Sequence, residues 1–204
     1  MASEKMKVRI ALLSAFITLA SFLYKFALGI VGASMVLIIA SISTLMVFVC
    51  KLLYAKNFTK SRESKKKAYF FMMIAAASYV AIFIIFSVLK VGGIDIKREV
   101  NYEGWLYILF IVFLLIMFLL SVFNLKGALQ KDDIIVIGIK EMTFISALTD
   151  VAIVFEFITR IVVYYVPVNI PGLVTTNRFM PIIVSALMIV VVVSMIKRHL
   201  SYKA

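Results

Sequence analysis

Six apolar runs, each close to or above the length that crosses a lipid bilayer, dominate this chain of 204 residues. A helix needs about 20 mostly apolar residues to cross the hydrocarbon core. A lone crossing segment must be helical, because lipid offers the backbone no hydrogen-bond partners. The runs therefore predict an all-α polytopic membrane protein, with residues 1–204 forming a single six-helix transmembrane domain. The expected spans are about 9–30, 33–55, 68–90, 105–126, 142–166 and 179–197.

Glycine and proline mark several of the expected span ends. The stretch "GIVGAS" between the first two runs suits the turn of a helical hairpin, and Gly92 and Gly93 follow the third run. Pro167 and Pro171 are expected to end the fifth span, which leaves an apolar loop up to residue 178. The basic N-terminus and first apolar run resemble a signal peptide, but the run continues to about Ile30 without a clear cleavage site. We expect a retained first span.

The distribution of Lys and Arg between the loops predicts the orientation of the chain. If the N-terminus is inside, sixteen of these residues lie in cytoplasmic segments and four, Lys90, Lys97, Arg98 and Arg178, lie in outer segments. Cytoplasmic loops of membrane proteins are enriched in Lys and Arg. We therefore expect both termini in the cytoplasm and an integral protein of the plasma membrane.

Composition argues against several classes of protein. The net charge of +12 suits nucleic acid, but the basic residues flank apolar spans and no nucleic-acid-binding motif accompanies them. Cys50 and His199 are the only residues of their types, which argues against an internal disulfide and a His/Cys metal site. No Gly-rich phosphate loop or catalytic Ser/His/Asp set is present. We expect no nucleic-acid partner, no metal, no cofactor and no enzymatic activity.

The densest basic stretch is "KNFTKSRESKKK", between the second and third runs. It favours a solvated loop that fixes topology. Contact with anionic lipid is the alternative interpretation. The residues that would make this contact are Lys60, Arg62, Lys65, Lys66 and Lys67.

Three ionisable residues lie inside the spans at similar depth. Lys25 in the first span and Arg160 in the fifth are each about six residues, or roughly 9 Å, from the outer ends. Glu156 precedes Arg160 by four residues, which places both on one helix face. Burying a charge in lipid costs at least about 2.5–3.5 kcal/mol, so partners are expected. We predict a cluster of Lys25, Glu156 and Arg160, interpreted as a packing clamp or as part of an ion path.

Asp150 lies deeper in the fifth span and has no basic residue within one turn. It is expected to be neutral, to be hydrogen-bonded to hydroxyl groups, or to contact water or a cation. Ser146 lies one turn before it, and Ser43, with Ser41 and Thr44, lies at similar depth in the second span. Asp150, Ser146 and Ser43 are the candidate coupling or ligand site.

Two stretches resemble the transmembrane domain of cation diffusion facilitators, which export zinc and manganese. They are "KFALGIVGASMVLIIASIS", continuing with "TLMVFV" to residue 49, and "SALTDVAIVF" at 146–155. The resemblance implies six helices with both termini inside. The metal-site positions carried over are Ser43, Val47, Ser146 and Asp150, and only Asp150 is a typical ligand. The resemblance thus implies a degenerate zinc site and no cytoplasmic metal-binding domain.

The chain is also similar to the substrate-binding subunits of energy-coupling-factor vitamin importers. Those are small six-helix proteins whose first helix docks a partner through small residues. Ala11 and Ala15 form such a pair here, and internal packing is the alternative interpretation.

Two hypotheses follow for function. The first is a transporter-like protein that moves or senses a cation or proton, with Asp150 as the coupling residue. The second is a non-transporting partner or assembly subunit, in a homo-oligomer or a larger importer, whose charges only fix helix packing.

Overall fold

The computed structural model describes residues 2–31, 34–92, 104–130, 133–165 and 171–202. In these residues the chain forms six helices and no strand, which confirms the predicted all-α fold. The helices are α1 (Ala2–Val31), α2 (Met35–Asn57), α3 (Arg62–Val91), α4 (Gly104–Leu129), α5 (Ile134–Tyr165) and α6 (Pro171–Ser201).

Four helices, α1, α3, α5 and α6, begin at least six residues earlier than predicted. α5 starts at Ile134, where a buried apolar run follows Asp133, whose carboxylate accepts a hydrogen bond from the Ile135 amide at 3.1 Å. α6 starts at Pro171, because proline lacks only an amide hydrogen that the first helical turn leaves unpaired. The prediction of a loop up to residue 178 was therefore wrong, and Pro167 lies outside the described residues.

The chain is an integral membrane protein. Five of the helices, α1, α2, α3, α4 and α6, are long and apolar enough to cross a bilayer. α5 is not among them. It carries Glu141, Asp150, Glu156 and Arg160 along its length.

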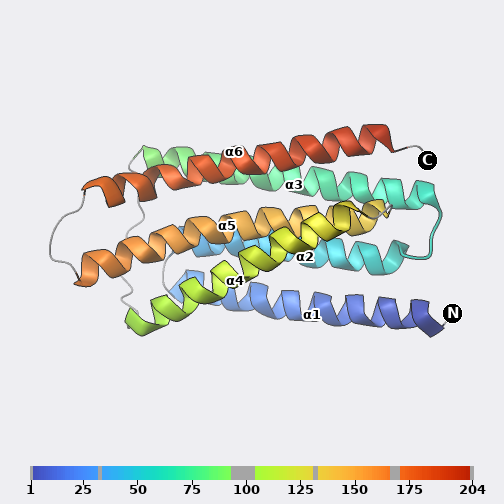
Figure 1. The fold of residues 1–204 in the computed structure, drawn as a ribbon, viewed down its shortest axis with the longest axis horizontal. Coiled ribbons are helices and arrows are strands. Elements are labelled where there is room, and N and C mark those ends of the chain that lie inside the picture. Colours follow the sequence, from blue (N-terminus) through green and yellow to red (C-terminus); the bar gives the residue numbers. More distant parts are fainter. Residues whose placement is uncertain (1, 32–33, 93–103, 131–132, 166–170, 203–204) are drawn as a thin grey trace.

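α5 lies at the centre of the bundle (Figure 1) and packs against α2, α3, α4 and α6. The two most peripheral helices are α1, which packs against α2, and α4, which packs against α5. Successive helices run in opposite directions, so α1 begins and α6 ends at the same end of the bundle. We call this the termini end.

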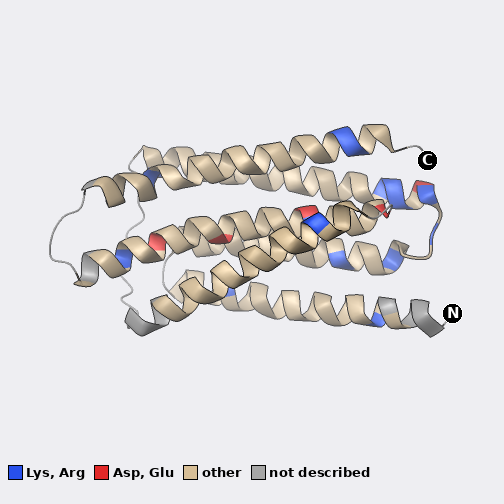
Figure 2. Cartoon of the chain, in the orientation of Figure 1, with Lys and Arg blue, Asp and Glu red and all other residues tan. Residues whose placement is uncertain are grey.

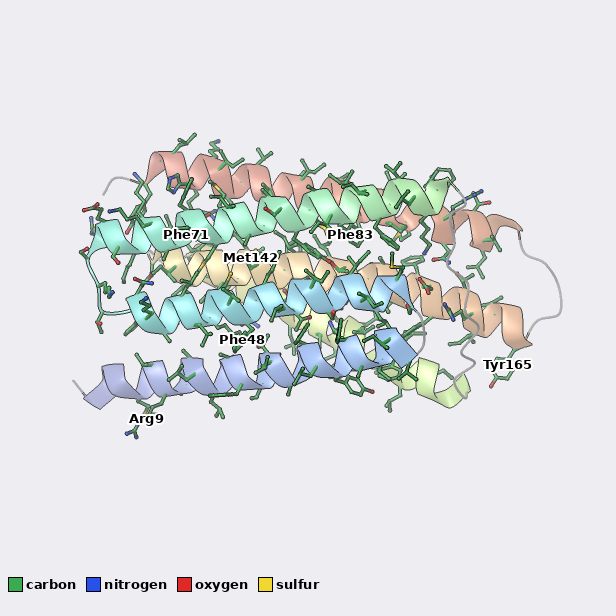
Figure 3. All side chains as sticks on the ribbon, turned by 180° about the vertical axis from the view of Figure 1, so that it is seen from behind. Arg9, Phe48, Phe71, Phe83, Met142 and Tyr165 are labelled. Carbon is green, nitrogen blue, oxygen red and sulfur yellow. The ribbon has the colours of Figure 1, made fainter. Side chains whose placement is uncertain are left out.

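The core is apolar and lies mainly between α3, α5 and α6. Tyr69, Phe83 and Met142 are fully buried there, and Figure 3 shows the labelled Phe83 and Met142 inside the bundle while Arg9 points away from it. In contrast, most large apolar side chains of α1 and α4 are exposed. Such surfaces suit contact with lipid, because lipid shields apolar side chains from water.

Gly138 allows α5 to approach α3 closely, and its replacement provides a test of the packing. A Cβ atom there would lie 2.7 Å from Tyr69 Cδ2 and 2.9 Å from Met72 Sδ. We expect Gly138→Ala to lower the free energy of unfolding by about 1–3 kcal/mol, measured by reversible unfolding in detergent micelles. The control is Gly127→Ala in α4, where a Cβ meets nothing within 4 Å and the helix gains about 0.5–1 kcal/mol. Equal effects of the two substitutions would contradict this packing.

Candidate functional site

An ion pair joins α1 to the middle of α5. Lys25 Nζ lies 2.6 Å from Asp150 Oδ1, and the two side chains are only 13% and 8% exposed. Asp150 lies near the midpoint of α5, about 24 Å along the helix from Ile134. The pair therefore places a positive and a negative charge deep in the bundle, between a peripheral helix and the central one.

This pair corrects two predictions. Lys25 was expected beside Glu156, and Asp150 was expected without a basic partner; Lys25 instead binds Asp150. The depth of a residue along α5 does not show which face of the helix its carboxylate occupies. Glu156 follows Asp150 by six residues, so its side chain leaves the helix axis about 240° away from that of Asp150, after one full turn. A helix that faces Asp150 therefore does not also face Glu156.

Glu156 has the predicted partner Arg160, and Lys90 takes the place expected for Lys25. Arg160 Nη2 lies 2.8 Å from Glu156 Oε1, and Lys90 Nζ lies 3.4 Å from Oε2. Lys90 also donates to Asn177 Oδ1 at 3.4 Å. Although Lys90 was predicted in an outer segment, it is buried at the end of α3. This cluster ties α3, α5 and α6 together, so a role in packing is sufficient to explain it.

The candidate serines contact each other rather than the carboxylate. Ser43 Oγ lies 2.9 Å from Ser146 Oγ across the α2–α5 interface, and Tyr79 Oη lies 2.7 Å from Thr149 Oγ1. The described hydrogen bond of the Asp150 carboxylate comes from Lys25. Ser43, Ser146 and Thr149 thus form a layer of buried hydroxyl groups at the depth of Asp150.

A third charged cluster, which the sequence interpretation missed, lies nearer the termini end. Glu141 is 2% exposed and accepts hydrogen bonds from Tyr69 Oη at 2.8 Å and from Arg198 Nη1. Glu141 lies one residue before the expected start of the fifth span at 142, so it was not considered among the charges inside the spans. The apolar run "IIVIGI" directly before Lys140 was the signal that the helix starts earlier.

Lys51 is a second missed residue, because it was counted with the loop lysines. It lies inside α2, and its Nζ donates to Thr18 Oγ1 at 2.6 Å and to Ser14 Oγ at 2.8 Å on α1. Lys51, Ser14 and Lys140 line an open pocket of about 290 Å³. The α1–α2 interface is therefore polar toward the termini end.

The predicted lipid-binding residues lie at the termini end, where Figure 2 shows Lys and Arg concentrated. Lys65 pairs with Asp133 at 2.8 Å, Lys66 donates to the Tyr202 carbonyl at 2.8 Å, and exposed Lys67 pairs with Glu63 at 2.7 Å. Residues 62–67 were expected in a solvated loop, but they form the first turns of α3. A hollow of about 670 Å³ lies between the start of α3 and the end of α6. The charged residues that line it are Lys60, Arg62, Lys65, Asp133 and Arg198.

An apolar cleft lies beside the ion pair. The cleft has a volume of about 830 Å³ and opens between α1 and α4, with walls that are almost wholly apolar. Tyr24 on α1 and Phe110 on α4 face each other across it, with ring centroids 6.2 Å apart. Lys25 also contributes to its lining. The ion pair thus borders a space that is open to the lipid side of the bundle.

No known protein family, curated protein or solved structure matches this chain at a significant level. Within the described residues, no group of three or more His, Cys, Asp or Glu side chains lies close enough together to hold a metal ion.

Proposed function

We propose that this chain is a small transporter-like membrane protein that moves or senses a proton or cation at Asp150. The observation that carries the proposal is the ion pair between peripheral α1 and central α5. Intramembrane ionisable residues are costly and usually mark ion or proton paths. A proton or a cation on Asp150 removes the need for Lys25, so its arrival frees α1 to move relative to α5.

Polar side chains on α1 support a route from the termini end to this pair. Ser14, Thr18, Ser21 and Lys25 are spaced by four, three and four residues, which places them on one helix face. Ser14 and Thr18 bind Lys51 beside an open pocket, and Ser21 and Lys25 line the large cleft. A proton that enters near Lys51 has hydroxyl groups along this face as far as Lys25.

The topology is part of the proposal. α5 has the length of its neighbours and packs among them, so we place it in the membrane as a sixth span. The concentration of Lys and Arg at the termini end favours a cytoplasmic location for both termini, in the plasma membrane. The similarity to cation diffusion facilitators would then be one of helix arrangement without the zinc site.

We also propose a contact with anionic lipid, made by fewer residues than the sequence suggested. Lys60 and Arg62 line the open hollow at the termini end, while Lys65, Lys66 and Lys67 already have partners within the chain. An anionic headgroup in the cytoplasmic leaflet is therefore expected to contact Lys60 and Arg62 first.

The second candidate function is a non-transporting partner or assembly subunit. It is favoured by the fact that Glu141, Asp150 and Glu156 each contact a basic side chain, as a packing clamp requires. The large exposed apolar surface of α1 and α4 offers room for another subunit or a second copy. Ala15, from the small-residue pair, is itself buried within this chain.

Proton flux separates the two functions. Purified protein is reconstituted in liposomes that contain a pH-sensitive dye, and pH and cation gradients are imposed. We expect flux through the wild type and at least about a tenfold loss for Asp150→Asn, because a neutral side chain carries no exchangeable charge. Glu156→Gln is the matched control and retains flux, since Glu156 belongs to a different cluster. A correctly folded wild type that shows no flux under any gradient would exclude transport.

A further inference from the structure

The cleft between α1 and α4 combines an apolar interior with one charged residue. Its lining on α4 runs from Ile108 to Ile116 and is apolar throughout, and α5 contributes Ile153 and Phe157. Lys25 is the one charged residue among its described lining residues. Its volume of about 830 Å³ is within the usual range for small-molecule sites.

The position of α1 explains why the cleft stays open. α1 packs against α2, and α4 packs against α5, while within the described residues these two peripheral helices make no close backbone approach to each other. Only side chains such as Tyr24 and Phe110 bridge them. A molecule dissolved in the bilayer can therefore reach Lys25 from the side, between two helices.

We infer that this cleft binds an amphipathic anion, with its acyl chain in the apolar space and its carboxylate on Lys25. The lysine ammonium has three donor hydrogens, and its described bond to Asp150 Oδ1 uses one. A carboxylate is the charge-complementary headgroup for the others. The inference names the substrate class of the proposed transporter, and it rests on the proposed function only in requiring that the Lys25–Asp150 pair can be exchanged.

Charge balance then couples the anion to a proton. Lys25 and Asp150 together are neutral, so an added carboxylate leaves one uncompensated negative charge in a site of low dielectric constant. Uptake of one proton from the bulk by the Asp150 carboxylate removes it, and Lys25 then pairs with the ligand. The ligand and the proton enter together, and no covalent bond forms or breaks other than the O–H bond on Asp150.

Acyl chains of ordinary lipid also fit an apolar cleft, so the test must depend on the headgroup. The protein is placed in nanodiscs of zwitterionic lipid and titrated calorimetrically with decanoate, decanol and decylamine. We expect decanoate to bind at least about tenfold more tightly than decanol, because only it pairs with a buried cation. Titration in two buffers of different ionisation enthalpy is expected to give an uptake of about one proton per decanoate.

Variants assign the effect to Lys25 and to the cleft. Lys25→Met is expected to remove the preference for decanoate and to leave decanol binding unchanged. The double variant Lys25→Met, Asp150→Asn provides the same readout without an unpaired carboxylate. Ala20→Trp, which fills the cleft, weakens both probes, and Asp150→Asn abolishes the proton uptake. Lys90→Met is the matched control in a different cluster and changes neither quantity.

Three outcomes would overturn the inference. The first is equal affinity for the three probes, which is the result expected if lipid fills the cleft without specificity. The second is a preference for decylamine, and the third is a preference for decanoate that survives in both Lys25 variants. Because binding is measured without a gradient, it is independent of flux. Decanoate binding without flux contradicts the transport proposal alone, whereas proton flux without decanoate preference contradicts this inference alone.

Discussion

Exchanging Lys25 for methionine is expected to lower the free energy of unfolding by about 3–5 kcal/mol, the usual cost of leaving one member of a buried ion pair alone. Asp150 is only 8% exposed on its side chain, and Lys25 supplies its described hydrogen bond. Methionine keeps most of the length of lysine, so the loss reports the charge rather than the packing. The measurement is reversible unfolding in detergent micelles.

The double variant Lys25→Met, Asp150→Asn is expected to recover most of this loss, because no charge then remains buried without a partner. Lys67→Met is the surface control. Lys67 and Glu63 form an exposed ion pair at 2.7 Å, so this change is expected to cost less than about 0.5 kcal/mol. A cost for Lys25→Met no greater than that for Lys67→Met would show that the Asp150 pair is not buried as described.

Replacing Arg198 with methionine is expected to have a second large effect, again about 3–5 kcal/mol. It leaves Glu141 buried at 2% exposure with Tyr69 as its remaining described hydrogen-bond donor. Tyr69→Phe removes the hydroxyl that donates a hydrogen bond to the same carboxylate, and it is expected to lower the free energy of unfolding by about 1–3 kcal/mol. The pair of variants therefore ranks the two partners of Glu141, with Arg198 as the stronger.

The control for this cluster is Glu141→Gln in the Arg198→Met background. The amide is uncharged and still accepts the hydrogen bond from Tyr69, so the double variant is expected to be more stable than Arg198→Met alone. If the double variant is instead the less stable of the two, Glu141 does not depend on Arg198 for its burial.

The helices could be predicted from the sequence because lipid leaves an apolar run only one regular structure. All six predicted helices are present. Their ends were less accurate, since an apolar run marks the part in hydrocarbon and not the whole helix. The early starts of α5 and α6 at Ile134 and Pro171 continue the helices beyond the expected spans.

The pairing of charges could be predicted only within one helix. Glu156 and Arg160 are four residues apart, and this spacing alone brings them together. The partners of Lys25 and Lys90 lie on another helix, and the choice between Asp150 and Glu156 depends on how α1 and α3 are rotated against α5. Depth along a helix contains no information on that rotation. The predicted depth of Lys25 was also wrong, because it matched Arg160, whereas its partner Asp150 lies ten residues before Arg160 on α5.

The claim that Asp150 exchanges a proton during transport is tested most directly by proton flux through the double variant Lys25→Met, Asp150→Asn in liposomes. This variant is expected to fold with nearly wild-type stability, which separates function from packing. We predict that its proton flux falls to the level of protein-free liposomes while the Glu156→Gln control remains active. Wild-type flux in the double variant would contradict the claim and leave the Lys25–Asp150 pair as a packing clamp.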